Sequence, residues 1–464
     1  MTEAGNNYSE KKTQLHISVR NLVEFIFREG DIDNRSSRAM SADAMMEGTR
    51  IHRKIQGSMG KEYQAEVPLS LVVEGDLYEL TVEGRADGIF TEDGKCFVDE
   101  IKGMYRKVEL FEKPVFVHRA QAMCYAYIFA LQNNMETIGI QMTYCNLETE
   151  QTKYFREEFS FEEIKKWFDD LMEEYGKWAT FQCEMKNQRQ ASIKELDFPF
   201  EYRPGQKKLV SDVYRTIMRQ KLLFMQAPTG VGKTISTIFP AVKAVGEELA
   251  DRIFYLTAKT ITATVAKETF ALLEKNGYRA KTIQITAKEK LCPCDEMECN
   301  PVTCPYAKGH FDRVNDAVFD LLHRCEMIER DDILSQADRY TVCPFELCLD
   351  TASWCDNIIC DYNYVFDPNV YLKRFFQEGI KGDYIFLIDE AHNMVERSRQ
   401  MYSAQIYKED FLTVKRIMKE HSRSIEKALE KCNKILLGMK RECENYTVYD
   451  TFGNMVFSLM RLMT

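Results

Sequence analysis

Residues 227–234, APTGVGKT, have the types and spacing needed to bind a nucleoside triphosphate. The apolar run KLLFMQ before them predicts a strand and the pattern after them predicts a helix, which is the context of a phosphate loop. Backbone N–H groups from Gly230 to Thr234, Gly232 among them, can then surround the β-phosphate at the helix N-terminus. We expect Lys233 to reach the β- and γ-phosphates of ATP and Thr234 to bind Mg²⁺.

An acidic motif, DEAH at residues 389–392, follows the apolar run YIFLI. This run predicts a buried parallel strand, and ligand sites of open parallel sheets lie at the carboxyl ends of their strands. We therefore expect Asp389 to bind Mg²⁺ through water, and Glu390 to orient or deprotonate the water that attacks ATP. We expect His392 to sense the γ-phosphate or to couple it to DNA.

Cysteines are concentrated in the stretch LCPCDEMECNPVTC, residues 291–304. The whole chain has 15 cysteines, and its N-terminus has no apolar stretch that resembles a signal peptide, so we expect a cytoplasmic protein. A cysteine cluster in that compartment more often binds metal than forms disulfides. Four thiolates suit either a [4Fe–4S] cluster or structural zinc, and the residues alone leave both open.

The clearest local signal is a β-hairpin centred on the Asp-Gly pair 93–94. With the turn at this position, Asp87 faces Glu100 and Arg85 faces Lys102. Facing residues have Cβ atoms about 5 Å apart, so two carboxylates repel unless a cation lies between them. A divalent metal and a phosphate would satisfy both pairs. The alternative is a solvated hairpin face of mixed charge, and a bulge would break the register.

Helical patterns lie on both sides of this hairpin in the sequence. In the first, His52 follows Gly48 by four residues, and in the second, Gln121 and Tyr125 share a face because they are also four apart. A lone histidine of this kind is usually a surface residue, and the tyrosine could equally pack in the core. The functional interpretation therefore depends on all the motifs together.

The order of these motifs resembles the RecB-type branch of the PD-(D/E)XK nucleases, over about residues 15–185. That pattern is G-x-x-x-H, Asp, E-x-K and Q-x-x-x-Y, and its counterparts here are Gly48 with His52, Asp87, Glu100 with Lys102, and Gln121 with Tyr125. The resemblance implies that His52, Asp87 and Glu100 hold Mg²⁺ or Mn²⁺. It implies that Lys102 steadies the attacking water or the developing phosphorane charge, and that Gln121 and Tyr125 contact DNA.

The second half of the chain resembles the XPD/DinG group of superfamily 2 DNA helicases, which move 5′→3′. The motifs that carry the resemblance are A-x-x-G-x-G-K-T, in which Ala227 replaces the usual first glycine, DEAH, Cys343-Pro344-Phe345 and the N-Y-x-x-D segment 363–367. That group inserts an iron–sulfur domain in its first motor domain, so the resemblance favours [4Fe–4S] over zinc. It implies the ligands Cys292, Cys299, Cys304 and Cys343, with Cys294 as the rival of Cys292.

Two more residues take roles from the helicase resemblance. Gln206, in the stretch YRPGQ upstream of the phosphate loop, is implied to contact the adenine base. Thr257 ends the predicted strand RIFYLT, at a position where such proteins touch the nucleic-acid backbone.

These patterns predict an α/β protein of several domains, consistent with 464 residues of which 45% are hydrophobic. We expect a PD-(D/E)XK nuclease-like domain at 1–190 and a RecA-like phosphate-loop motor domain at 195–464. The motor domain would include an iron–sulfur insertion at 285–350 and the start of a helical arch at 396–464.

The formal net charge of −10 argues against a protein coated in basic charge, although a local basic groove is compatible with it. No run of about 18 apolar residues occurs, so we expect no membrane span. No second motor domain follows DEAH in this sequence, and that half normally supplies arginines that complete the ATP site. We therefore expect the missing motor half in a longer chain or in a partner.

The sequence thus predicts an ATP-dependent 5′→3′ DNA helicase with a fused metal-dependent nuclease, acting on single-stranded or branched DNA in repair or recombination. Its expected cofactors are ATP, Mg²⁺ (or Mn²⁺ in the nuclease site) and a [4Fe–4S] cluster. One alternative is a nuclease whose ATPase half is only a nucleotide-gated DNA-binding platform. Another is a non-catalytic DNA-binding scaffold.

Overall fold

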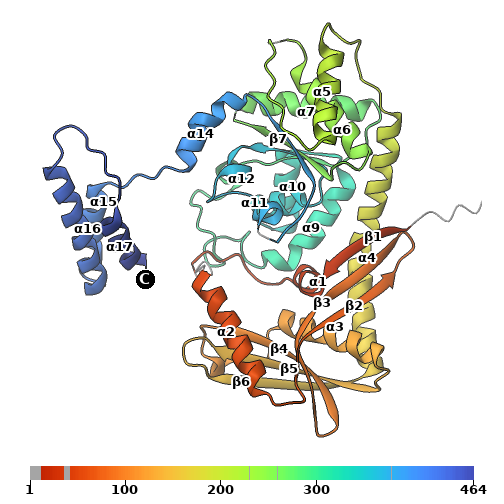
Figure 1. Ribbon diagram of the computed structural model, residues 1–464, viewed down its shortest axis with the longest axis vertical. Helices are drawn as coiled ribbons and strands as arrows, with labels where there is room; N and C mark the ends of the chain where they lie inside the picture. Colours follow the sequence, from red (N-terminus) through yellow and green to blue (C-terminus); the bar gives the residue numbers. More distant parts are fainter. Residues whose placement is uncertain (1–11, 36–41, 229, 259, 378, 464) are drawn as a thin grey trace, which may run out of the picture. The chain divides into compact units, whose positions relative to one another are not determined.

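We describe the protein from a computed structural model, which covers residues 12–35, 42–228, 230–258, 260–377 and 379–463. In these ranges no helix is both long and apolar enough to cross a membrane. The chain forms two compact units, one of Met1–Val365 with Leu372–Ala391 and one of Phe366–Tyr371 with His392–Thr464. The first unit contains two β-sheets (Figure 1).

The first sheet has six strands in the order β1-β3-β4-β5-β6, with β2 paired to β3. They are β1 (Thr13–Ser18), β2 (Gln64–Glu74), β3 (Tyr78–Glu92), β4 (Lys95–Met104), β5 (Thr137–Asn146) and β6 (Thr152–Ser160). The helices are α1 (Val19–Ile26), α2 (Ala42–Ser58), α3 (Phe116–Gln132) and α4 (Phe161–Glu195), with the short 3-10 helix η1 (Val108–Leu110). Helix α3 contacts β5, β4 and α4 through its buried side chains, so it closes the core of this sheet.

The predicted hairpin between β3 and β4 is confirmed. Asp93 and Gly94 both have positive φ, 50° and 78°, as a two-residue type I′ turn requires. The antiparallel ladder keeps the predicted register from the turn as far as the pair Gly88 and Asp99.

The facing pairs predicted just beyond this ladder are not formed. Strand β1 pairs with residues 78–83 of β3. It lies on the same edge of β3 as β4, so β4 cannot continue along that edge and the two hairpin strands separate. In the gap, Oδ2 of Asp87 accepts the backbone N–H of Ile101 at 2.7 Å instead of facing Glu100 across a ladder. Arg85 pairs with Pro68 of β2 and not with Lys102.

The second sheet has five strands in the order β11-β7-β10-β8-β9, and each neighbouring pair is parallel. They are β7 (Arg252–Thr257), β8 (Thr282–Gln284), β9 (Met327–Ile328), β10 (Asn357–Asp361) and β11 (Tyr384–Ile388). The helices are α5 (Gln206–Met218), α6 (Lys233–Gly246), α7 (Thr260–Lys275), α8 (Lys288–Leu291), α9 (His310–Arg324), α10 (Arg330–Tyr340), α11 (Pro344–Ala352), α12 (Asn363–Phe366) and α13 (Lys373–Phe376). The predicted strands at 252–257 and 384–388 are confirmed and lie side by side.

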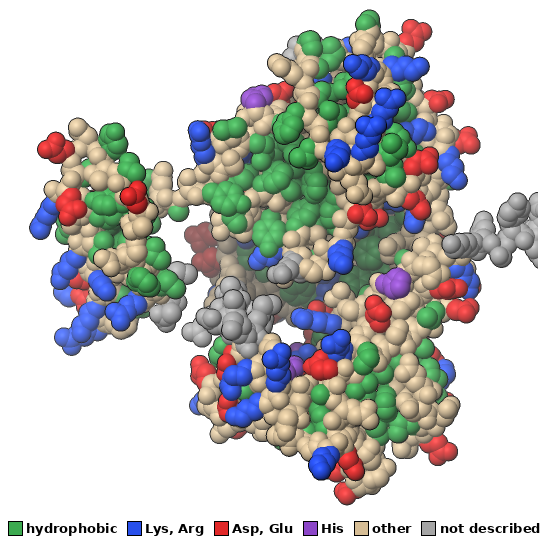
Figure 2. All heavy atoms as spheres, viewed as in Figure 1, with side chains coloured by type: hydrophobic (Ala, Val, Ile, Leu, Met, Phe, Trp, Pro, Cys, Tyr) green, Lys and Arg blue, Asp and Glu red, His purple; other side chains and the backbone are tan. Residues whose placement is uncertain are grey.

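The apolar run before the phosphate loop, predicted as a strand, is not one. Residues 221–228 contain no helix or strand, and Leu222 and Phe224 are each 89% exposed. Strand β11 ends the described sheet, and its Phe386 and Ile388 are also exposed. Figure 2 shows hydrophobic side chains gathered in a hollow over this sheet. A strand needs a hydrogen-bonded neighbour, and in the part of the chain that the structure describes no strand pairs with this run.

The second unit is helical. It contains the 3-10 helix η2 (Ala391–Asn393) at its start, then α14 (Met394–Met401), α15 (Lys408–Met418), α16 (Arg423–Arg441) and α17 (Gly453–Met463). Phe411, Leu429, Cys432 and Met455 form its buried core. The predicted helical character of 396–464 is therefore present, and its assignment to a helical arch stays a prediction.

Candidate active sites

Helix α2 carries His52 and packs on the first sheet. Ile51 and Ile55, on one face of the helix, are buried against Ile101 of β4. This apolar contact holds the helix on the strand that carries Glu100, so His52 lies close to the residues with which the sequence grouped it.

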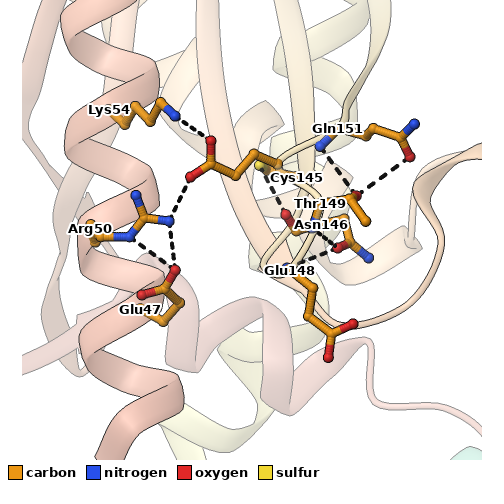
Figure 3. Close-up of polar contacts among 9 residues, drawn as sticks. Glu47, Arg50, Lys54, Cys145, Asn146, Glu148, Thr149 and Gln151 are labelled. Carbon is orange, nitrogen blue, oxygen red and sulfur yellow. Dashed lines mark hydrogen bonds and ion pairs between the residues drawn. The ribbon is translucent and has the colours of Figure 1, made fainter.

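A second contact holds α2 from its charged face (Figure 3). Arg50 and Lys54 both donate to the carboxylate of Glu150, which lies in the turn between β5 and β6. The bond from Arg50 is 2.7 Å long. Asn146 closes this turn, because its Oδ1 accepts the N–H of Thr149 at 2.7 Å. Two contacts on different faces fix the helix more firmly than either alone, which positions His52.

Three predicted metal ligands lie near one another at the point where β3 and β4 separate. Nδ1 of His52 is 3.5 Å from Oδ1 of Asp87. Glu100 is only 2% exposed, and its Oε2 is buried with no hydrogen-bond partner among the described residues. Gln56, one turn after His52, donates to the backbone carbonyl of Asp87 at 2.9 Å and so ties α2 to β3.

The other motif residues complete the group. Nζ of Lys102 lies 2.7 Å from Oε1 of Glu100 and donates to Oε1 of Gln121 at 3.2 Å. Tyr125 is buried, and an added Cβ on Gly84 would lie 2.5 Å from its hydroxyl oxygen. The structure thus brings the predicted nuclease residues together, while the DNA contacts of Gln121 and Tyr125 stay a prediction.

Burial sets the protonation of this site. It raises the pKa of Glu100 to about 8, against the opposing charge of Lys102. Burial also disfavours charge on His52, but the hydrogen bond and charge of Asp87 outweigh it, so the pKa of His52 is raised. The buried carboxyl and the imidazole therefore both hold protons more readily than free side chains do.

These residues fit a divalent metal by their chemistry. Imidazole and two carboxylates are ligands suited to Mg²⁺ or Mn²⁺, and an unpaired buried carboxylate oxygen needs a positive partner. Within the described ranges, no group of three or more His, Cys, Asp or Glu side chains is already arranged to hold a metal ion. Small side-chain rotations at His52, Asp87 and Glu100 would therefore accompany metal binding.

The phosphate loop is built on glycines. Gly230 and Gly232 have φ of 81° and 77°, a region that favours glycine, and Gly232 is the N-cap of α6. Lys233, the first residue of α6, places its Nζ 3.7 Å from Oε1 of Glu390. The loop and DEAH, more than 150 residues apart in the chain, therefore meet at the carboxyl end of β11.

The DEAH carboxylates are positioned by the sheet and by two tyrosines. Asp389 donates its N–H to the carbonyl of Leu256 at 2.9 Å, which extends β11 along β7. The Tyr362 hydroxyl donates to the carbonyls of Asp389 and, at 3.3 Å, Glu390. Burial and the charge of Asp389 raise the pKa of Tyr255, and a hydrogen bond with Thr234 opposes this. The predicted Mg²⁺ ligands, Thr234 and Asp389, are thus linked through one tyrosine.

Glu390 has a backbone φ of 47°, the left-handed region that only glycine adopts freely. Such a conformation costs about 1–3 kcal/mol and persists where surrounding contacts impose it. Here the N–H of Glu390 donates to Oδ1 of Asp389 at 3.1 Å. His392 belongs to the second unit, so its predicted role at this site stays a prediction.

Two residues with roles implied by the helicase resemblance have structural contacts. Gln206 is buried, accepts the N–H of Arg203 at 3.0 Å and donates to the carbonyl of Val231 at 3.3 Å, so it braces the phosphate loop. Thr257 is 5% exposed, and its hydroxyl is hydrogen-bonded to that of Thr262. Adenine contact by Gln206 and DNA contact by Thr257 stay predictions.

The five candidate cysteine ligands lie within residues 285–350, which we call the cysteine module, and each is half-buried. They are Cys292, Cys294, Cys299, Cys304 and Cys343. Sγ of Cys294 is 3.8 Å from Sγ of Cys304, and burial with these neighbouring thiols raises the pKa of Cys294 to about 12. A hydrogen bond to Cys299 raises the pKa of Lys288, with Cys343 and Cys292 also contributing. Cys294, which the sequence ranked behind Cys292, thus lies close to another candidate ligand, Cys304.

Cys343 is the N-cap of α11, where backbone amides favour a thiolate. Burial raises the pKa of its thiol to about 11, while hydrogen bonds from the amides of Glu346 and Phe345 oppose the rise. The N–H of Cys343 donates to Nδ1 of His310 at 3.1 Å. Burial lowers the pKa of His310 to about 4, so its ring is neutral and can accept. The sequence did not indicate His310, because only the fold brings it to Cys343.

Comparison with known proteins identifies one part of the chain. The DEAD_2 family model matches residues 271–411. This stretch, called the DEAD_2 segment below, is similar to that family. It contains all five candidate cysteines and DEAH, whereas the phosphate loop lies upstream of it.

Curated relatives share modest identity with the chain. Regulator of telomere elongation helicase 1 of Rattus norvegicus is 20% identical over 248 residues, which are 43% of this chain and 19% of that protein. The general transcription and DNA repair factor IIH helicase subunit XPD/RAD3 of Saccharomyces cerevisiae is 23% identical over 232 residues, 42% of this chain and 29% of that protein. The chain thus spans less than a third of the length of either relative.

Among solved structures, an XPD helicase covers 57% of this chain and 50% of its own, with 16% identity and a TM-score of 0.34.

Proposed function

We propose that this chain is the ATP-binding and DNA-engaging part of an XPD-type 5′→3′ DNA helicase that acts in repair or recombination. The observation that carries the proposal is the 3.7 Å approach of Lys233 to Glu390. Lys233 would bind the phosphates of ATP, and Glu390 would direct the attacking water. When bound, Mg²⁺ neutralises phosphate charge, and Thr234 and Asp389 would hold it.

The similarity of the DEAD_2 segment to helicases supports the reaction class. DNA as substrate and the 5′→3′ direction come from the helicase resemblance and remain proposals. The cysteine module would hold a [4Fe–4S] cluster, with structural zinc as the alternative, and would help to grip and part DNA.

Nucleotide binding tests this proposal directly. We expect the chain to bind a fluorescent ATP analogue in the presence of Mg²⁺, and single-stranded DNA to alter that affinity. Absence of Mg²⁺-dependent nucleotide binding by a folded chain would refute the motor assignment.

As a second function, we propose metal-dependent cutting of DNA by the first sheet and its helices. The supporting observation is the convergence of His52, Asp87, Glu100 and Lys102, with one buried carboxylate oxygen left unpaired. A bound Mg²⁺ or Mn²⁺ supplies Lewis-acid activation of the phosphodiester and of water. Lys102 would hold Glu100 and offer its positive charge to the phosphate.

Cutting assays with Mn²⁺ separate the remaining alternatives. Cutting that vanishes in Asp87→Ala and Glu100→Ala would exclude a non-catalytic scaffold. Cutting that is unchanged in Lys233→Ala, with or without ATP, would indicate a nuclease whose ATPase half only binds DNA. Cutting that becomes weak and nucleotide-insensitive in Lys233→Ala would instead support a motor that drives the nuclease.

A further inference from the structure

The loop that carries most of the candidate cysteine ligands has little structure of its own. Residues 292–309, between α8 and α9, contain no helix or strand. Asn300, which is 5% exposed, organises one turn by accepting the N–H groups of Val302 and Thr303 at 3.0 and 3.1 Å. The N–H groups of Cys304, Ala307 and Lys308 form further turns with carbonyls inside the loop. Backbone groups that these turns leave over need partners from outside the loop, because unsatisfied backbone groups are costly.

A segment from the N-terminal half supplies this support. Residues 30–34 follow α1, and three of their contacts reach the cysteine loop. The N–H of Asn34 donates to the carbonyl of Cys299 at 2.9 Å, and the N–H of Ile32 donates to that of Ala307 at 2.9 Å. Oδ1 of Asp31 accepts the N–H of Gly309 at 2.6 Å.

Two further hydrogen bonds fix the same segment to the start of α9. Gly30 donates its N–H to Oδ1 of Asp312 at 2.7 Å, and its carbonyl accepts the N–H of Phe311 at 3.0 Å. Gly30 has a φ of 95°, so it turns the chain where a side chain would be strained.

The segment is anchored before it reaches the loop. Phe25 of α1 contacts the rings of Trp178 and Trp354, with centroids 5.0 and 5.7 Å apart. Nη1 of Arg28 donates to Oδ2 of the buried Asp350 at 2.9 Å. An aromatic contact and a buried ion pair thus join α1 to the module that includes α11.

We propose that residues 30–34 are a strap that holds the cysteine loop in place beside α9, so that the N-terminal half supports the proposed metal site. The inference rests on the proposed metal-binding role of the cysteines. Asp31 is then a positioning residue, since it touches the loop but supplies no ligand. Loss of the strap contact should let the loop open and release metal faster.

Asp31 and Asp33 provide a matched pair for the test. Among the described residues, the carboxylate of Asp33 bonds only within its own turn, to the N–H and guanidinium of Arg35. In Asp31→Ala, we expect transfer of bound iron or zinc to a chelator to be about fivefold faster than in wild type, which corresponds to the loss of one ordinary hydrogen bond. Asp33→Ala, and Asp31→Asn, which keeps an acceptor oxygen, should match wild type. Equal rates in Asp31→Ala and wild type would overturn the strap.

Hydrogen exchange gives a second readout that does not depend on metal. We expect Asp31→Ala to raise amide exchange in residues 299–312, while exchange in β3 and β5 stays unchanged. If the wild type holds neither iron nor zinc, the metal proposal fails, and exchange still decides the strap. Unchanged exchange in 299–312 would refute the strap whatever the metal content.

Discussion

The ammonium nitrogen of Lys102 lies 2.7 Å from Oε1 of Glu100, whose other carboxylate oxygen is buried without a hydrogen-bond partner among the described residues. The lysine thus satisfies half of a carboxylate that the fold has removed from water. The remaining oxygen is oriented by the same contact, because Lys102 is itself held by Gln121. This pairing explains why a metal suits the site and why a lysine must accompany it.

The titration of Glu100 should appear in metal binding. Its pKa of about 8 means that the carboxyl holds a proton at neutral pH, and a metal must displace that proton. We expect Mn²⁺ affinity to rise roughly tenfold per pH unit below about pH 8 and to level off above it. Titration of Mn²⁺ followed by electron paramagnetic resonance measures this. An affinity independent of pH would contradict the assignment of Glu100 as a ligand.

The same titration should affect stability, with a definite sign. The pKa of Glu100 is raised from its ordinary value of 4.5 to about 8 in the fold, so between these values the folded state binds more protons than the unfolded state. Its contribution to stability therefore falls as the pH rises from about 4.5 to about 8. Glu100→Gln cannot titrate at this position. As the pH rises through this window, the unfolding temperature of the variant should therefore increase relative to that of wild type. Parallel curves for the two proteins would show that Glu100 is not buried as described.

Lys233→Ala should remove nucleotide binding without unfolding the protein. The side chain is partly exposed, and its ionic contact is with Glu390. We expect affinity for an ATP analogue to fall by about 100-fold, the scale of losing one preorganised charged donor. Lys221→Ala, at the exposed start of the same segment, is the control and should bind normally. Equal loss in both variants would point to a general charge effect.

Cys294→Ser should lose bound metal as completely as Cys304→Ser does. Their sulfurs are 3.8 Å apart, so one metal centre would reach both. Iron, acid-labile sulfide and zinc per chain after anaerobic purification measure the loss. Cys325→Ser, a half-buried thiol of the same module outside the candidate set, is the control. Full metal content in Cys294→Ser, with loss in Cys292→Ser, would restore the ligand choice made from the sequence.

Gly84→Ala should disturb Tyr125 and with it the proposed nuclease site. An added Cβ would lie 2.5 Å from the tyrosine hydroxyl oxygen, and the buried ring has little room to move. We expect the free energy of unfolding to fall by about 1–3 kcal/mol and Mn²⁺-dependent cutting to decrease. Gly57→Ala is the matched control, because a Cβ there meets open space in helix α2. It should gain about 0.5–1 kcal/mol and cut normally. Denaturant unfolding and a cutting assay measure both effects.

The features that the sequence determined by itself are local. The hairpin register followed from Asp93-Gly94, because a two-residue turn with positive φ at both positions allows one pairing near the turn. The strands YIFLI and RIFYLT, and the helix after the phosphate loop, also followed from short apolar patterns and glycines. In each case the deciding interactions lie within a few residues.

Only the tertiary structure decided the features that depend on distant segments. Strand β1 takes the edge of β3 and ends the hairpin ladder before Asp87, which redirects that carboxylate to Ile101. The run KLLFMQ has the composition of a strand, yet it forms none where no neighbour among the described residues pairs with it. The strap likewise joins Asp31 to Gly309, and no local pattern encodes such a pairing. These outcomes depend on which backbone edges are already occupied, and that is a property of the assembled fold.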